Sequence, residues 1–138
     1  MTPVLVVDDD EDIRQTLRFI LDDAGYNVSD APNGQTALRM LRAATEPAVV
    51  LVDLLMPGLT GAQLLETMRD DGATHRHRFI VMTAASHPQV QVHAPLFTAL
   101  GVPVLTKPLV VDALLDTVAA AAAHLPAGGD NCASSSPA

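Results

Sequence analysis

Short apolar runs alternate with amphipathic stretches along the chain, and this alternation predicts the fold. The runs lie at residues 4–7, 26–31, 49–53, 79–82 and 102–106, and each has the length of a strand. Between the runs, apolar residues recur at helical spacing, as at Ile13, Leu17 and Leu21. Strands that alternate with helices predict an α/β fold with a doubly wound parallel sheet, because parallel strands need crossover connections.

The polarity of the runs predicts the order of the strands. Three runs are continuously apolar, which is typical of strands covered on both faces, and they are residues 4–7, 49–52 and 79–82. Residues 26–31 contain three polar side chains, and residues 102–106 contain Pro103, which cannot donate to a ladder. We therefore expect these two runs at the edges of a five-stranded parallel sheet in the order 2-1-3-4-5, which is the flavodoxin-like arrangement.

The connecting segments carry their own signals. Asp10 and Asn33 are expected to cap helices, and residues 60–63 have the spacing of a capping box. A helix between residues 86 and 101 contains two prolines and should be short, kinked or late to start. The basic cluster at residues 74–78 is expected to be a solvated loop rather than a metal pair or a phosphate site, since alternate loop residues share no fixed geometry.

Composition and charge narrow the class of protein. We expect one folded domain over residues 1–125 and a disordered tail over 126–138, where bulky apolar residues are few. The single cysteine, Cys132, excludes an intrachain disulfide, and no apolar run approaches the roughly 18 residues of a membrane span. The residues before the first strand also lack the basic segment of a signal peptide. These observations favour a cytoplasmic protein without membrane insertion. The net charge of −8 disfavours direct binding to nucleic acid.

Polar side chains follow the strands at one end of the predicted sheet. They are Asp8 and Asp9 after the first strand, Asp53 at the end of the third, Thr83 at the end of the fourth and Lys107 after the fifth. The carboxyl ends of parallel strands share one edge, and the order of the strands reverses between the first and the third. We therefore expect these side chains to meet in the crevice at that edge.

Three carboxylates at one edge repel one another unless a positive charge lies among them. Mg²⁺ is commonly held by one or two carboxylates together with waters and phosphate oxygens. Lys107 would supply a second positive charge, and Thr83 a hydroxyl donor for a phosphoryl oxygen. Asp53 would then act as a nucleophile and form an acyl phosphate.

On these residues the chain resembles a response-regulator receiver domain, the phosphoacceptor half of two-component signalling. The resemblance covers residues 2–124 and rests on Asp8-Asp9, the segment Val-Asp-Leu-Leu-Met-Pro-Gly around Asp53, Thr83 and Lys107-Pro108. It implies that Mg²⁺ is held by Asp9, Asp53 and the main-chain carbonyl of Leu55, with Asp8 acting largely through water. It also implies phosphorylation of Asp53 by a sensor histidine kinase or a phosphotransfer protein.

The resemblance implies a signalling domain and not an enzyme that turns over an external substrate. No effector domain follows the last predicted helix, so we expect a single-domain response regulator that changes conformation and signals to an unknown protein target. A phosphorelay intermediate that passes the phosphoryl group onward is the alternative. A weak homodimer is also compatible with the resemblance.

Two more distant alternatives share parts of this pattern. A flavodoxin-like cofactor binder needs a hydroxyl- and glycine-rich loop after the first strand, whereas residues 8–10 are all aspartates and would repel a phosphate. A magnesium-dependent phosphatase with an aspartyl nucleophile usually has a general acid two residues after that nucleophile, where this chain has Leu55. Both alternatives therefore fit the residues less well than a receiver domain does.

Overall fold

The computed structural model of the protein describes residues 2–54, 61–70, 76–84, 95, 97–99, 101–107 and 109–125. The elements are β1 (Pro3–Val7), α1 (Glu11–Asp23), β2 (Asn27–Ala31), α2 (Gly34–Ala43), β3 (Val49–Asp53), α3 (Gly61–Asp70), β4 (Arg78–Ala84), β5 (Val104–Lys107) and α5 (Val111–Ala123). Residues 95 and 97–99 are also helical, while most of the predicted proline-containing helix and the whole predicted tail lie outside the described residues.

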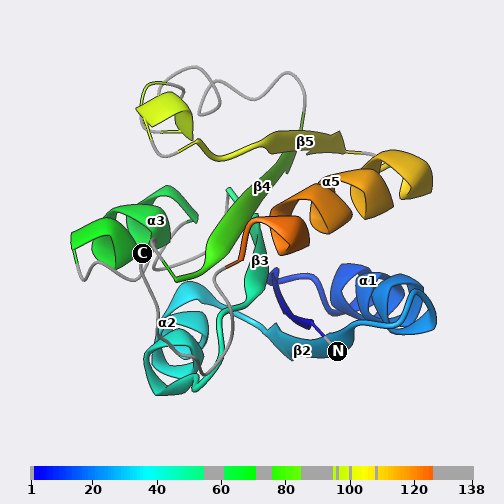
Figure 1. Ribbon diagram of the computed structural model, residues 1–138, viewed down its shortest axis with the longest axis horizontal. Helices are drawn as coiled ribbons and strands as arrows, with labels where there is room; N and C mark the ends of the chain where they lie inside the picture. The colour runs from blue at the N-terminus through cyan, green and yellow to red at the C-terminus, as the bar shows by residue number, and fades with distance from the viewer. Residues whose placement is uncertain are drawn as a thin grey trace.

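The five strands form one parallel sheet in the order β2-β1-β3-β4-β5 (Figure 1). This confirms the predicted order, including the edge positions of β2 and β5. All five residues of β3 are buried, the first four of them apolar, which agrees with a central strand covered on both faces. Within the described ranges, no helix is long and apolar enough to cross a membrane.

Helices cover both faces of the sheet. In Figure 1, α1 and α5 lie on one side of the strands and α2 and α3 on the other. Alternate strand residues supply the two cores: Val6, Leu51 and Met82 pack with the first pair of helices, and Val7 and Val52 with the second. Two cores built from alternating side chains hold the strands in register, since a slip by one residue would exchange the two faces.

The predicted helix caps are present where the structure describes them. Asp10 caps α1, and its side chain accepts hydrogen bonds from the N–H groups of Asp12 and Ile13. Asn33 caps α2 and accepts from the N–H of Thr36 at 2.8 Å. Thr60, the first residue of the predicted capping box, lies outside the described residues.

Two expectations need correction. The fifth strand begins at Val104 rather than at residue 102. Pro103 precedes it, and the carbonyl of Pro103 accepts from the N–H of Val81 at 3.0 Å.

The predicted solvated loop at residues 74–78 is wrong at its end, because Arg78 begins β4 and His77 is 1% exposed. Nδ1 of His77 accepts from the N–H of Ala48 at 3.1 Å, so the ring packs at the start of β3. Residues 74 and 75 lie outside the described ranges.

Candidate phosphoacceptor site

The register of the sheet brings the acidic residues together. Val7 of β1 pairs with Val52 of β3, so Asp8 and Asp53, which follow these residues, lie level with each other on adjacent strands. Both lie at the carboxyl edge of the sheet, at the point where the strand order reverses. Thr83 lies one residue beyond Met82, the partner of Asp53 in β4.

Lys107 reaches the two buried carboxylates from the end of β5. Its Nζ lies 3.2 Å from Oδ2 of Asp8 and 3.2 Å from Oδ2 of Asp53. Asp8 is fully buried and Asp53 is 8% exposed, whereas Asp9 lies open to solvent. One oxygen of each of Asp8, Asp9 and Asp53 lies within 4.8 Å of the other two, and we call these three residues the acidic site. Thr83 is buried at the same edge of the sheet.

Burial and neighbouring charges shift the pKa values of Asp8 and Lys107. Burial raises the pKa of Asp8 above its ordinary value of 3.8, and the negative charge of Asp53 adds to this, while the N–H of Asp10 and Lys107 act in the opposite direction. Burial lowers the pKa of Lys107, but the charges of Asp53 and Asp8 outweigh it and raise the pKa above 10.5. Lys107 is therefore protonated at neutral pH and offsets part of the negative charge around it.

Gly61, the first residue of α3, lies against the main chain at the end of β3. Its N–H donates to the carbonyl of Leu54 at 3.1 Å. A Cβ atom at this position would lie 2.5 Å from the carbonyl oxygen of Asp53 and 2.9 Å from Cα of Leu54. Only glycine allows this close approach, so the first residue of α3 packs against the main chain of Asp53 and Leu54.

The acidic site fits a hard divalent cation. Mg²⁺ prefers oxygen ligands and is usually held by one or two carboxylates with waters and phosphate oxygens. The three carboxylates of the site supply such oxygens within 4.8 Å of one another, and their exposed member leaves access from solvent. Leu55, the main-chain ligand implied by the resemblance, lies outside the described residues.

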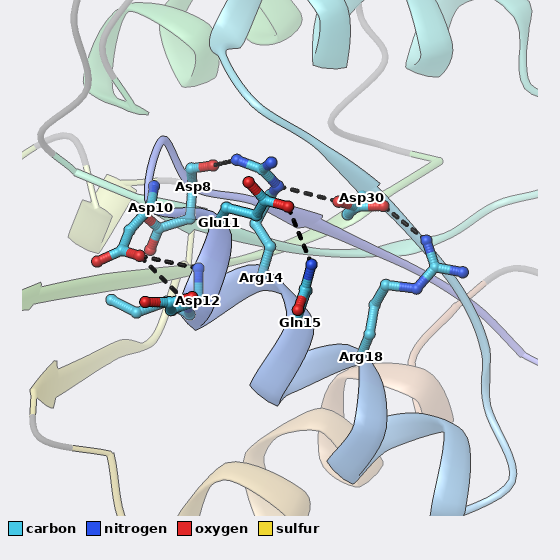
Figure 2. Close-up of polar contacts among 9 residues, drawn as sticks. Asp8, Asp10, Glu11, Asp12, Arg14, Gln15, Arg18 and Asp30 are labelled. Atoms are coloured by element: carbon cyan, nitrogen blue, oxygen red, sulfur yellow. Dashed lines mark hydrogen bonds and ion pairs between the residues drawn. The ribbon is translucent and has the colours of Figure 1, made fainter.

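The structure also shows a contact to the site that the sequence did not predict. Arg14 of α1 donates to the main-chain carbonyl of Asp8 at 2.8 Å and to Oδ2 of Asp30 at 2.9 Å (Figure 2). The available signals were an arginine one helical turn after the capping Asp10 and an acid within an edge strand. Neither residue pattern indicates which groups Arg14 binds, because that depends on how α1 packs against β2.

Comparison with known proteins agrees with this fold and site. The family model of the response regulator receiver domain matches residues 4–119, so the chain belongs to that family. Receiver domains are signalling domains that accept phosphoryl groups from histidine kinases and signal to downstream targets.

Two of the relatives are a putative transcriptional regulator and a transcriptional regulatory protein. A putative transcriptional regulator of Haloferax volcanii is 36% identical over 115 residues, which are 83% of this chain and 18% of that protein. The C4-dicarboxylate transport transcriptional regulatory protein DctD of Pseudomonas aeruginosa is 33% identical over 117 residues, which are 85% of this chain and 24% of that protein. This chain thus spans less than a quarter of the length of either relative.

A solved structure shows the same fold. The chemotaxis protein CheY4 of Vibrio cholerae is similar to this chain with a TM-score of 0.75 and 30% sequence identity. The similarity covers 88% of this chain and 98% of the CheY4 chain. The fold of this chain is therefore that of a CheY-like receiver domain.

Proposed function

We propose that Asp53 accepts a phosphoryl group from a sensor histidine kinase or a phosphotransfer protein, and that this modification changes how the chain binds a downstream protein. The observation that carries the proposal is the position of Lys107 Nζ, 3.2 Å from both Asp8 Oδ2 and Asp53 Oδ2, at an edge where three carboxylates converge. Three carboxylates close together repel one another, and the positive charge of Lys107 offsets this repulsion. The same charge can stabilise the negative oxygens of an incoming phosphoryl group.

In the proposed reaction a carboxylate oxygen of Asp53 attacks the phosphorus atom of a phosphohistidine. A new O–P bond forms and the P–N bond breaks, with its electron pair returning to the imidazole. The imidazole leaves as a neutral group because its other nitrogen carries a proton. Lys107 then has a phosphoryl oxygen as an additional partner, and Thr83 supplies a hydroxyl donor at the same edge.

Asp8, Asp9 and Asp53 would hold Mg²⁺ together with the main-chain carbonyl of Leu55. Bound there, the ion would neutralise negative charge on the phosphoryl oxygens and on the site. Asp53 is the proposed nucleophile because it contacts Lys107 and is 8% exposed. Asp8 contacts Lys107 as well but is fully buried, and Asp9 is exposed.

Incubation with a small phosphodonor and Mg²⁺, followed by intact mass measurement, tests the proposal. Wild-type protein should gain the mass of one phosphoryl group, and Asp53→Asn should gain none. Glu66→Ala, at an exposed position of α3, is the control and should behave like wild type. A gain of mass that persists in Asp53→Asn would contradict the assignment of Asp53.

A further inference from the structure

Arg14 joins the edge strand β2 to the loop that carries the acidic site. Its Nε donates to Oδ2 of Asp30 at 2.9 Å and its Nη1 donates to the carbonyl oxygen of Asp8 at 2.8 Å. Figure 2 shows the guanidinium of Arg14 between these two residues. The Arg14 side chain is 13% exposed and that of Asp30 is 26% exposed, so both bonds are partly buried. A guanidinium that donates in two fixed directions is well suited to hold two groups at a set separation.

The carbonyl that Arg14 binds belongs to the peptide unit between Asp8 and Asp9. Because a peptide unit is planar, a fixed carbonyl also fixes the N–H and the Cα of Asp9. The N–H of Asp8 donates to the carbonyl of Ala31 at 3.2 Å, and its Oδ1 accepts from the N–H of Asp10 at 2.9 Å. Arg14 adds the contact that sets the plane of the peptide leading into Asp9.

Asp30 holds Arg14 in the required conformation. Its Oδ2 binds Arg14, and its Oδ1 binds Nη1 of Arg18 at 2.6 Å. Ala31, the next residue of β2, binds the N–H of Asp8 through its main chain. The end of β2 therefore holds residue 8 at two points, directly through Ala31 and indirectly through Asp30 and Arg14.

We propose that Arg14, anchored by Asp30, is a positioning residue that orients the Asp8–Asp9 peptide and so directs the exposed Asp9 carboxylate toward Asp8 and Asp53. The proposal deepens the proposed function and rests on it for the Mg²⁺ that these carboxylates would hold. Arg14 contacts no reacting atom, and it acts on the main chain rather than on a carboxylate of the site.

Arg18 provides a matched control for Arg14. Both arginines extend from α1 and pair with Asp30. The side chain of Arg18 is 50% exposed, whereas that of Arg14 is 13% exposed and also binds the Asp8 carbonyl. Arg18→Ala removes one positive charge and one ion pair, as Arg14→Ala does, and leaves the bond from Arg14 to the Asp8 carbonyl in place. Arg14→Lys keeps the charge but lacks the planar fork that binds two acceptors at once.

Titration of each variant of the 138-residue chain with Mg²⁺ in a calorimeter, without phosphodonor, tests the proposal. Arg14→Ala should weaken Mg²⁺ binding by about tenfold, the low end of the effect of removing a group that orients a metal ligand. Arg14→Lys should lose a similar amount, and Arg18→Ala should stay within about twofold of wild type. If Arg14→Ala does not fold, Arg14→Lys decides the outcome. Wild-type affinity in the Arg14 variants, or an equal loss in Arg18→Ala, would overturn the proposal.

Phosphorylation as a function of Mg²⁺ concentration provides a second readout. If Arg14 acts by positioning Asp9, Arg14→Ala should need more Mg²⁺ and yet reach a rate close to that of wild type at saturation. A lower rate at saturating Mg²⁺ with unchanged Mg²⁺ dependence would overturn the proposal. Wild-type protein that binds Mg²⁺ but takes up no phosphoryl group would contradict the proposed function alone, because the calorimetric comparison would still decide the role of Arg14.

Discussion

Lys107 is the residue on which the charge balance of the site depends. Its Nζ is shared between Asp8 and Asp53 at 3.2 Å each, and its raised pKa keeps it protonated at neutral pH. It compensates for two carboxylates that are held close together away from water. A cation that enters the acidic site therefore meets carboxylates that already have a positive neighbour.

Removal of Lys107 should consequently favour the binding of Mg²⁺. We expect Lys107→Ala to bind Mg²⁺ as tightly as wild type or a fewfold more tightly, because a repelling positive charge is lost. Phosphorylation from a small donor should slow by at least about tenfold, which corresponds to about 1.4 kcal/mol of lost stabilisation of the phosphoryl oxygens. Calorimetric titration and intact mass measure the two effects separately. A marked loss of Mg²⁺ affinity in Lys107→Ala would mean that the lysine supports the metal site instead of competing with it.

His77 couples the stability of the fold to pH. Burial lowers the pKa of His77 below 6.5 and the charge of Arg76 acts in the same direction, while the main chain of Leu41 opposes them. Its Nδ1 accepts a hydrogen bond from Ala48 N–H, which a proton on that nitrogen would break. The unfolded chain thus binds a proton more readily than the folded chain. Above pH 6.5 the ring is neutral in both the folded and the unfolded chain, and His77 does not reduce the free energy of unfolding. As the pH falls below 6.5, the unfolded chain binds a proton first, so the free energy of unfolding decreases until the pH reaches the lower pKa of the folded state.

The free energy of unfolding of wild type should therefore fall on going from about pH 7.5 to about pH 5.5, by up to about 1.4 kcal/mol for each unit below the unfolded pKa. In His77→Asn, which keeps an acceptor but does not titrate, this part of the decrease should disappear. Denaturant titration at the two pH values measures the difference. Parallel curves for wild type and His77→Asn would contradict the role assigned to His77.

At the scale of elements, the junction of β3 with α3 connects the fold most directly to the site. Gly61 approaches the backbone of Asp53 and Leu54 so closely that a Cβ would overlap main-chain atoms. Main-chain atoms at the end of a central strand cannot move aside as the tip of a flexible side chain can. An added methyl group must therefore displace either the start of α3 or Asp53 itself.

Gly61→Ala should destabilise the protein by about 2 kcal/mol, within the range for overpacking of a well-packed site, and should also slow phosphorylation of Asp53. The control is Glu66→Ala, at an exposed position of the same helix, which should change stability by no more than about 0.5 kcal/mol. Denaturant unfolding and intact mass measure the two effects. Stability and phosphorylation like those of wild type in Gly61→Ala would show that the backbone there yields without consequence.

At the scale of the whole molecule, the pattern of apolar runs was sufficient to predict the sheet. The continuously apolar segments became β1, β3 and β4, and the segments with polar residues or proline became the edges. Asp8, Asp9, Asp53 and Lys107 could be placed together from the sequence because strand order alone brings the carboxyl ends of parallel strands to one edge. These predictions required only local pattern and topology.

Contacts that depend on packing between elements could not be predicted in the same way. The bond from Arg14 to the Asp8 carbonyl requires the rotation of α1 about its axis and the position of Asp30 on β2. The burial of His77 depends on packing against α2 and the start of β3. The solvated loop was predicted because alternate loop residues share no fixed geometry, and that reasoning does not include packing between elements. Periodicity assigns a residue to a face but does not identify its partner on another element.

Chemical trapping of the acyl phosphate is the measurement that identifies which aspartate carries the phosphoryl group. Protein treated with a phosphodonor and Mg²⁺ is reduced with borohydride, which converts the acyl phosphate of an aspartate into homoserine, and is then digested and sequenced by mass spectrometry. If Asp53 is the phosphoacceptor, homoserine should form at position 53 and at no other aspartate, and none should form when the donor is omitted. Homoserine at Asp8 or Asp9, or donor-dependent phosphorylation that yields no homoserine at position 53, would contradict this assignment.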